Sequence, residues 1–174
     1  MRAKVEGIEV FEDFVPEPAL RWEAFGDESL GGRSTVINSA VFEEDGIRFA
    51  RLEGRVAPSR AGGFVQLRAW KPGGRLDAGC RTRLVVVARA LPGFHAIRLR
   101  TPRCALPWSC YAAPFPVGPG WTELSIPFDA FEAEDVEPGP LETGLIRSLS
   151  FVAMAAPGAP RREVRLDIAR VLAE

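Results

Sequence analysis

The sequence predicts an all-β fold, and within that class a two-sheet jelly-roll β-sandwich. About nine short segments rich in apolar and β-branched residues follow one another, separated by glycine and proline turns, as in sandwiches and barrels. No amphipathic segment is long enough for a substantial helix, and no repeat with the period of a solenoid or propeller is visible. The 174 residues suit a single domain, 1–174, against which the proline-punctuated lead-in 1–20 is expected to pack.

The composition limits the classes of partner. Hydrophobic residues make up 47% of the chain and charged residues 26%, which is ordinary for a folded globular protein. A net charge of −1 lacks the basic excess of a nucleic-acid-binding protein, so no nucleic-acid partner is expected. No apolar run approaches the ~20 residues of a membrane-spanning helix. Early acidic residues interrupt any secretory signal, so we expect a cytoplasmic protein that is not integral to a membrane.

The cysteines give no indication of a metal centre. The chain has three, at Cys80, Cys104 and Cys110, and none belongs to a Cys-x-x-Cys pair of the kind that binds zinc. Free thiols in a reducing compartment are therefore expected. A disulfide between Cys104 and Cys110 is the alternative if the protein is exported.

The first constrained feature is the stretch from residue 21 to 34. Gly31 and Gly32 can adopt the positive φ angles that residues with a Cβ avoid, so the chain can reverse there and enter a strand at residue 34. Asp27 can cap this reversal by accepting hydrogen bonds from nearby backbone N–H groups. The stretch is either a structural corner beside a buried tryptophan or a corner whose Asp27 and Arg33 also bind a ligand.

The next strands follow from turn signals and alternation. Residues 34–42 and 46–52 are predicted strands, and the Asp-Gly step between them predicts a hairpin. Gly62 and Gly63 form a second glycine-pair turn, after which residues 64–70 alternate strictly. One face of that strand would carry Val65, Leu67 and Ala69, and the other Phe64, Gln66, Arg68 and Trp70.

The second half of the chain continues this pattern. A β-branched run predicts a central strand within residues 80–90, and the turn at residues 92–93 predicts a second hairpin with residues 94–100. Residues 128–131 are expected to form at most one helical turn. The acidic segment 132–144, rich in proline and glycine, is predicted to be the longest loop. The remaining predicted strands are 111–115, 121–127, 145–154 and 163–171.

The sequence contains no recognisable catalytic constellation. Its single histidine, His95, is in phase with Ile97 and Leu99, which predicts a position in or beside the core. Neither a Ser-His-Asp order, nor an HExxH motif, nor a P-loop or GxGxxG spacing is present. We therefore expect no catalytic residues, no cofactor and no enzymatic activity, although a pair of acids that meet only in space would leave no trace in the sequence.

Arginines favour a binding function. Gln66, Arg68 and Trp70 share one strand face, and Arg81, Arg83, Arg98 and Arg100 are expected on two neighbouring strand segments. Arginine and tryptophan are favoured at protein interfaces, and guanidinium groups grip acidic groups and sugars. The alternative is a solvated sheet face with arginine stems lying over aromatic rings. The predicted binding residues are Asp27, Arg33, Gln66, Arg68, Trp70, Arg83, Arg98 and Arg100, whereas Trp22, Trp108 and Trp121 are expected to be core residues or loop plugs.

Several collinear motifs resemble the complex I intermediate-associated protein 30 (CIA30) family, whose fold is similar to the galactose-binding-domain-like jelly roll. They are Trp22 with Asp27 and Leu30-Gly31-Gly32-Arg33-Ser34, then Gly54-Arg55-Val56, Gly62-Gly63-Phe64-Val65-Gln66-Leu67-Arg68, and Trp121 with Ile126-Pro127-Phe128 and Phe131. The resemblance covers residues 22–171. The chain departs from the family pattern at Leu30, in place of methionine, at Arg60-Ala61, and at Leu91-Pro92-Gly93, in place of a Gly-Asp-Gly turn.

This resemblance implies a non-catalytic protein. Mitochondrial relatives assist the assembly of respiratory complex I, and related sandwich modules bind carbohydrate. A stand-alone copy without a targeting segment looks bacterial. The resemblance therefore implies a protein partner, such as a subunit of a membrane or redox complex, recognised through the face that bears Gln66 and Arg68. The alternative is a carbohydrate bound on the same face through Arg68, Trp70 and Asp27.

Overall fold

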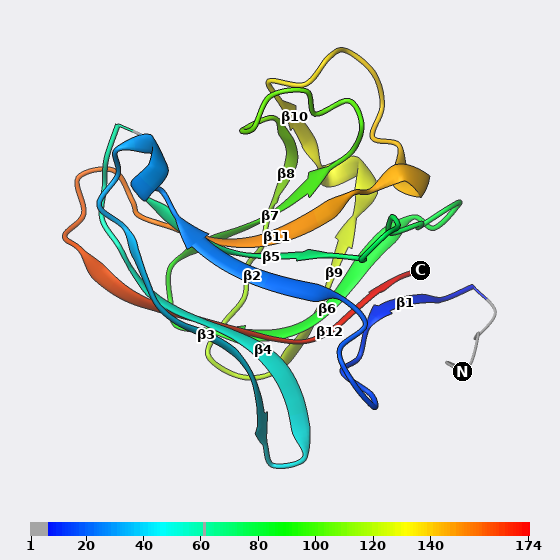
Figure 1. Ribbon diagram of the computed structural model, residues 1–174, viewed down its shortest axis with the longest axis horizontal. Coiled ribbons are helices and arrows are strands. Elements are labelled where there is room, and N and C mark those ends of the chain that lie inside the picture. The colour runs from blue at the N-terminus through cyan, green and yellow to red at the C-terminus, as the bar shows by residue number, and fades with distance from the viewer. Residues whose placement is uncertain (1–6, 61) are drawn as a thin grey trace.

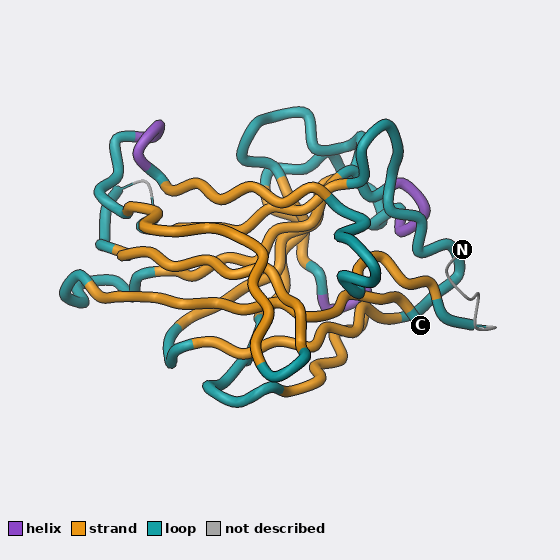
Figure 2. The backbone as a smooth tube through the Cα atoms, turned by 60° about the horizontal axis from the view of Figure 1, so that its bottom comes forward, coloured by secondary structure: helices purple, strands orange, loops and turns teal. Residues whose placement is uncertain are grey.

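The protein is a sandwich of two antiparallel β-sheets, as the sequence predicts (Figure 1). The computed structural model describes residues 7–60 and 62–174. Sheet A has the strand order β3-β4-β12-β6-β9, with β1 also paired to β12, and sheet B has the order β10-β8-β7-β11-β5-β2. Strands form the body of the molecule and loops lie mostly around its margins (Figure 2).

The strands have the following bounds. Sheet A contains β1 (Glu9–Glu12), β3 (Thr35–Glu44), β4 (Ile47–Val56), β6 (Arg83–Ala90), β9 (Thr122–Pro127) and β12 (Arg162–Ala173). Sheet B contains β2 (Arg21–Gly26), β5 (Phe64–Trp70), β7 (Phe94–Arg100), β8 (Cys110–Pro114), β10 (Glu132–Glu134) and β11 (Ser148–Met154). Three short 3-10 helices, η1 (Glu28–Leu30), η2 (Phe128–Ala130) and η3 (Thr143–Leu145), are the helices of the described chain, and none is long enough to span a membrane.

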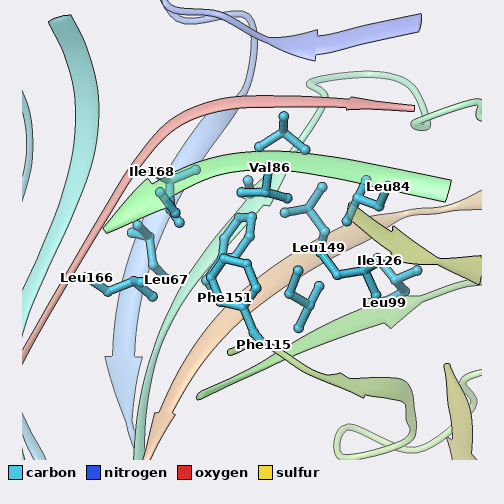
Figure 3. Close-up of a cluster of buried hydrophobic side chains, with 14 of the residues drawn as sticks. Leu67, Leu84, Val86, Leu99, Phe115, Ile126, Leu149, Phe151, Leu166 and Ile168 are labelled. Atoms are coloured by element: carbon cyan, nitrogen blue, oxygen red, sulfur yellow. The ribbon is translucent and has the colours of Figure 1, made fainter. Parts of the chain in front are cut away.

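The core lies between the two sheets. On β5, Val65, Leu67 and Ala69 are fully buried, which confirms the predicted alternation of that strand. These side chains meet apolar side chains of the other sheet because alternate residues of each strand point into the space between the sheets. The labelled cluster in Figure 3 combines Leu67, Leu99, Leu149 and Phe151 of sheet B with Leu84, Val86, Leu166 and Ile168 of sheet A.

The described part of the N-terminal segment is tied to this core. Phe11 and Phe14 are buried in it, and the buried Glu12 carboxylate accepts hydrogen bonds from the backbone N–H groups of Phe14 (2.8 Å) and Leu20 (2.9 Å). A carboxylate that accepts several N–H groups can hold a loop that lacks regular pairing. Residues 1–6 of the expected 1–20 lead-in lie outside the described residues.

The predicted second hairpin is wrong. β6 pairs with β12 and β9 in sheet A, whereas β7 pairs with β11 and β8 in sheet B. The turn at Pro92 therefore carries the chain from one sheet to the other. Arg162 of β12 fixes this crossing, because its guanidinium donates hydrogen bonds to the Pro92 carbonyl (2.6 Å) and the Met154 carbonyl (3.1 Å).

Three strands were not predicted. β1 and β2 lie in stretches for which the sequence predicts a lead-in and a turn, respectively. β10 lies at the start of the predicted long loop. All three are short, and the exposed acidic sequence of β10 has no apolar alternation to reveal it. The first predicted hairpin, by contrast, is confirmed by the pairing of β3 with β4.

Candidate functional site

One row of polar side chains crosses the outer face of sheet B. Arg68 of β5 and Arg98 of β7 both lie opposite Ser150 of β11, the strand between them. The row continues to Glu23 of β2, opposite Arg68. Because side chains at paired positions project to the same side of a sheet, the structure brings the predicted residues Arg68 and Arg98 together on one surface.

A groove of about 460 Å³ lies over this row. Its floor is formed by outward side chains of β5, β7 and β11, including Gln66, Arg68, Arg98 and Ser150. The η1 turn stands at one end, and the loop before β8 together with β10 stands at the other (Figure 1). At these ends the groove is lined by Ser29, Leu30 and Gly62, and by Pro107, Trp108 and Glu134, respectively.

Arg98 is the least satisfied charge in the groove. Its Nε atom is buried without a hydrogen-bond partner, and within the described residues no ion pair engages its guanidinium. The guanidinium lies 5.4 Å from the centroid of the Phe64 ring, so one face of the cation is supported by an aromatic surface. The terminal Nη groups, which make no hydrogen bond within the described residues, are therefore the donors available to an acceptor that enters the groove.

Arg68 is partly neutralised. Its Nη2 donates to a Glu23 oxygen at 2.7 Å, and its guanidinium lies 5.2 Å from the Phe25 ring and 5.3 Å from the Trp70 ring. Its Nε atom, like that of Arg98, is buried and has no hydrogen-bond partner. Trp70 thus supports Arg68 from the side and is not itself among the residues that line the groove.

Two uncharged polar residues complete the floor. Gln66 is 9% exposed and Ser150 is 6% exposed, and neither side chain makes a hydrogen bond within residues 7–60 and 62–174. Their polar atoms are not among the buried ones without a partner, so both side chains face the open groove and can bond to a ligand there. Ser150 was not predicted as a site residue. Its place between the inward-facing Leu149 and Phe151 on one strand nevertheless indicates that its side chain points outward.

Arg100 has a supporting role. Its guanidinium donates hydrogen bonds to the carbonyl oxygens of Cys104 (3.1 Å) and Leu106 (2.9 Å) and to that of Pro107. These bonds hold the loop before β8 in place. That loop presents Trp108 with 57% of its surface exposed at the groove, so the expectation that Trp108 plugs the loop is wrong.

A buried thiol lies beside this end of the groove. Burial raises the pKa of Cys110 to about 12, and the nearby Arg98 charge opposes the shift. The Cys110 Sγ donates to a Glu134 carboxylate oxygen at 3.4 Å. Cys110 is therefore protonated at neutral pH, and Cys80, Cys104 and Cys110 are all free thiols in the structure.

Asp27 lies beneath the η1 turn and does not reach the groove. It is fully buried, and its carboxylate accepts hydrogen bonds from the Ser34 N–H (2.9 Å), the Ser59 hydroxyl (3.2 Å) and the Phe64 N–H (3.3 Å). This arrangement joins the turn to the starts of β3 and β5. The structural alternative for Asp27 accounts for all of these contacts, and the carboxylate is buried outside the groove.

The positive φ expected of the glycine pairs is confirmed at Gly31 and is not found at Gly32. Gly31 has a φ of +79°, Gly62 of +101° and Gly63 of +69°, all in the region that favours glycine. Gly32 is required for a different reason, since its backbone passes directly over the Asp27 carboxylate. Gly62 also lines the groove, so its turn contributes to the shape of the candidate site.

Two further predicted binding residues, besides Asp27 and Trp70, do not line the groove. Arg33 is exposed on the turn before β3 and does not line it. Arg83 lies on β6 in sheet A, so the expected continuous surface joining it and Arg81 to Arg98 is wrong. The physical reason is the crossing at Pro92, which puts β6 and β7 in different sheets.

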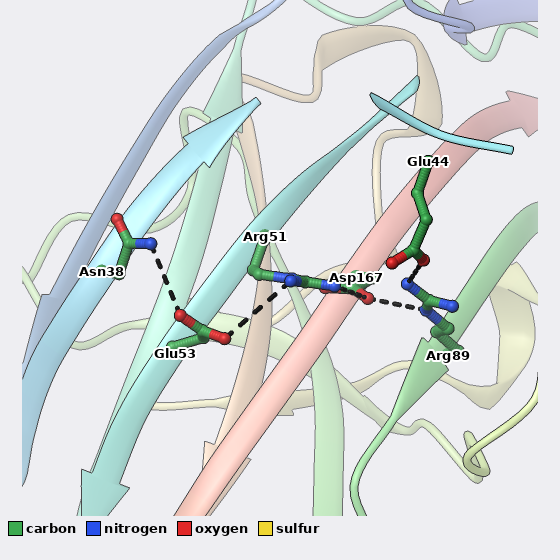
Figure 4. A network of polar contacts seen from close by, with 6 residues as sticks. All are labelled: Asn38, Glu44, Arg51, Glu53, Arg89 and Asp167. Atoms are coloured by element: carbon green, nitrogen blue, oxygen red, sulfur yellow. Dashed lines mark hydrogen bonds and ion pairs between the residues drawn. The ribbon is translucent and has the colours of Figure 1, made fainter. Parts of the chain in front are cut away.

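Sheet A carries a polar network that the sequence did not reveal (Figure 4). The fully buried Asp167 carboxylate accepts hydrogen bonds from Arg51 Nε (2.7 Å) and Nη2 (2.9 Å) and from Arg89 Nε (2.7 Å). The hydrogen bond with Asp167 raises the pKa of Arg51 above its ordinary value. Arg89 also pairs with Glu44 and stacks 4.6 Å from the Trp121 ring. Because every charge here has a partner, we assign this network a structural role.

His95 is buried, as its phase predicts, and faces away from the groove. Burial and, to a smaller extent, the Arg162 charge lower the pKa of His95 to about 4, against the opposing effect of the Gly93 backbone. The imidazole is therefore neutral at pH 7. Within the described residues no three His, Cys, Asp or Glu side chains gather in a cluster that could hold a metal ion.

The comparison with protein families identifies one match. The model of the family described as "Complex I intermediate-associated protein 30 (CIA30)" matches residues 12–168. This range includes both glycine-pair turns and every strand that forms the floor of the groove. The comparison with curated proteins found no match.

Solved structures similar to this one are carbohydrate-binding modules. The family 11 module of the cellulosomal cellulase Lic26A-Cel5E of Clostridium thermocellum has a TM-score of 0.71 at 13% identity, over 98% of this chain and 95% of that one. A family 11 module from the same organism, in complex with a β-1,3-1,4-mixed-linked tetrasaccharide, has a TM-score of 0.69 at 13% identity, over 95% and 94% of the two chains. At these identities the likeness concerns the fold.

Proposed function

Since the chain belongs to the complex I intermediate-associated protein 30 family, we propose that it is a non-catalytic binding protein that recognises a partner protein in the groove of sheet B. The recognition would serve the assembly of a larger complex, as the family description suggests. Fold alone does not determine function, so the proposal depends on the groove itself.

The observation that carries the proposal is the unsatisfied polar floor. Arg98, Gln66 and Ser150 project into one groove, and no described residue hydrogen-bonds their side chains. The Gln66 and Ser150 side-chain polar atoms are not among the buried ones without a partner, so they face the open groove. A ligand can supply acceptors and donors to these groups, unlike the network around Asp167, in which every charge is already paired.

The rim of the groove favours a protein as the ligand. Leu30 is 56% exposed at one end, and Trp108 is exposed at the other. Aromatic and arginine side chains are enriched in protein interfaces, where a few buried anchors supply most of the binding energy. A polar floor between two ends that each expose a large apolar side chain matches the mixed surface of a polypeptide.

Affinity purification from the native host tests the proposal. The protein, expressed at near-endogenous level, is expected to recover a defined partner. Recovery should be lost in the double variant Arg98→Gln/Trp108→Ala and retained in Arg170→Gln, which removes an exposed charge from sheet A. If the wild type and both variants all fail to recover the partner, or if all of them recover it, the result would contradict a docking role for the groove.

Carbohydrate binding is the second candidate. The observation that favours it is the exposed Trp108 ring beside the polar floor, because sugars stack on aromatic rings and accept hydrogen bonds from arginine. One structure of similar fold holds a mixed-linked tetrasaccharide. Calorimetry with that tetrasaccharide and a glycan array distinguish the two candidates: saturable binding that is lost in Trp108→Ala would put the carbohydrate first.

A further inference from the structure

We infer that the groove accepts an extended segment of the partner protein that carries a single acidic side chain between two apolar ones, with Arg98 as the residue that binds the carboxylate. This inference rests on the proposed function and specifies the chemistry of the ligand. Three features of the groove support it: the state of its charges, the spacing of its arginines and the polarity of its ends.

The charges leave Arg98 without a partner. Arg68 is paired with Glu23, Arg100 is occupied by carbonyl oxygens of the loop before β8, and Glu134 accepts the hydrogen bond of the Cys110 thiol. A carboxylate is the acceptor that best matches an available guanidinium edge, since charge-assisted hydrogen bonds are about twice as strong as neutral ones. Arg98 therefore favours an anionic group.

The acidic residues at the other end limit the number of anions. Glu134 and Asp135 both line the groove beside β10. A run of acidic residues would bring like charges together at this end, which costs binding energy in a site that is partly shielded from water. Attraction to Arg98 and repulsion by Glu134 and Asp135 together favour a segment with one carboxylate near Arg98 over a polyacidic segment.

The strand register places this carboxylate over Ser150. Arg68 and Arg98 are both cross-strand neighbours of Ser150, so their Cα atoms lie about 10 Å apart, two inter-strand spacings. Long guanidinium side chains can close that distance around a group between them. A carboxylate over Ser150 can then accept from the Ser150 hydroxyl and from the terminal Nη groups of Arg98, because the Nε atoms of both arginines are buried beneath the floor.

The two ends of the groove distinguish a peptide from an acidic sugar. Leu30 and Met154 line one end, and Pro107 and Trp108 line the other. Alkyl surfaces such as those of Leu30 and Met154 suit apolar side chains, which a uronic acid lacks. An extended peptide advances about 3.3 Å per residue, so apolar side chains a few positions either side of the acid can reach these ends.

Selection from a random peptide library displayed on phage tests the inference. The full-length protein is expected to enrich peptides with Asp or Glu at one fixed position and apolar residues on both sides. By fluorescence anisotropy, a selected peptide should bind about tenfold more tightly than its Asn or Gln counterpart, the ratio expected when a charge-assisted bond is lost.

Variants identify Arg98 as the residue responsible. Arg98→Gln should reduce the preference for the acid to less than about twofold, and Arg98→Lys should retain part of it, since lysine keeps the charge but not the planar fork. Arg83→Gln on sheet A is the matched control and should behave as the wild type. Circular dichroism and melting temperature show whether each variant is folded.

The outcomes separate this inference from the proposed function. Peptides that bind and compete with the native partner without preferring an acid would overturn the inference and leave the proposed function standing. An acid preference unchanged in Arg98→Gln would do the same. Failure to enrich any peptide, together with saturable binding of an oligogalacturonate, would overturn both.

Discussion

Gly32 passes so close to Asp27 that a Cβ atom on Gly32 would lie 2.0 Å from the Asp27 Cγ atom. The Asp27 carboxylate in turn joins the η1 turn to the starts of β3 and β5 through Ser34 and Phe64. The same turn presents Leu30 to the groove. The paired glycines therefore shape one end of the candidate site through a buried acid that does not line the groove.

Replacing Gly32 with alanine should destabilise the protein by about 3 kcal/mol. The added Cβ must displace a buried carboxylate that accepts several hydrogen bonds, so both overpacking and lost bonds contribute. Urea denaturation measures the change. Gly120→Ala is the control, because a Cβ there meets nothing within 4 Å, and it should change stability by less than about 0.5 kcal/mol. Equal effects of the two substitutions would contradict this account of the turn.

Replacing Asp167 with alanine should destabilise the protein by about 3–5 kcal/mol. The substitution leaves Arg51 and Arg89 with no carboxylate between them, and breaking a buried ion pair costs far more than the pair contributes when intact. Glu163→Ala removes an exposed partner of Arg55 and should cost less than about 1 kcal/mol. Both changes can be measured by chemical denaturation, and a small effect of Asp167→Ala would show that the network is not needed.

Stability should fall as the pH falls from about 6.5 to about 4, in part because of His95. Its pKa is lowered to about 4 in the folded protein, whereas an unfolded histidine has the ordinary value of 6.5. As the pH falls, the unfolded state therefore binds the proton before the folded state does. The contribution of the neutral His95 to the free energy of unfolding is complete above pH 6.5 and is lost as the pH falls through the folded pKa. His95→Leu should remove up to about 3 kcal/mol of this dependence. The free energy of unfolding of the wild type and of His95→Leu is measured from denaturation curves at pH 7, 5.5 and 4.5. The same dependence on pH in both proteins would contradict this prediction.

One thiol of the native protein should react rapidly with a disulfide reagent at pH 8. Cys80 is exposed, whereas Cys104 and Cys110 are buried and burial raises the pKa of Cys110 to about 12. Thiolate character and access together control the rate. A spectrophotometric thiol assay should count one fast thiol per chain, none in Cys80→Ser, and three after unfolding. A fast signal that persists in Cys80→Ser would contradict the assigned burial.

Much of the fold could be predicted from local patterns. The bounds of β5 and β7 were predicted without error, because each strand alternates cleanly between core and surface residues. The pairing partner of β7 could not be predicted in the same way. A Pro-Gly turn serves both a hairpin and a crossing between sheets, and the Arg162 contact with Pro92 that fixes the crossing joins residues 70 positions apart.

The candidate site was predicted in part. Gln66, Arg68 and Arg98 lie together because their phase within each strand points them to the same face. Arg83 does not join them, since the sheet to which β6 belongs is decided by long-range pairing. The role of Trp108 depends on a loop held by Arg100, and the sequence of that loop, rich in proline, showed no such contact.

Photo-crosslinking in the native host tests most directly whether the groove of sheet B is the docking surface. A benzophenone amino acid is placed at Leu30 or Trp108 in the groove, or at Arg83 on sheet A as the control. The account predicts that both groove positions crosslink the same partner protein and that the Arg83 position does not. Crosslinking of that partner from Arg83 as efficiently as from Trp108, or from neither groove position, would contradict it.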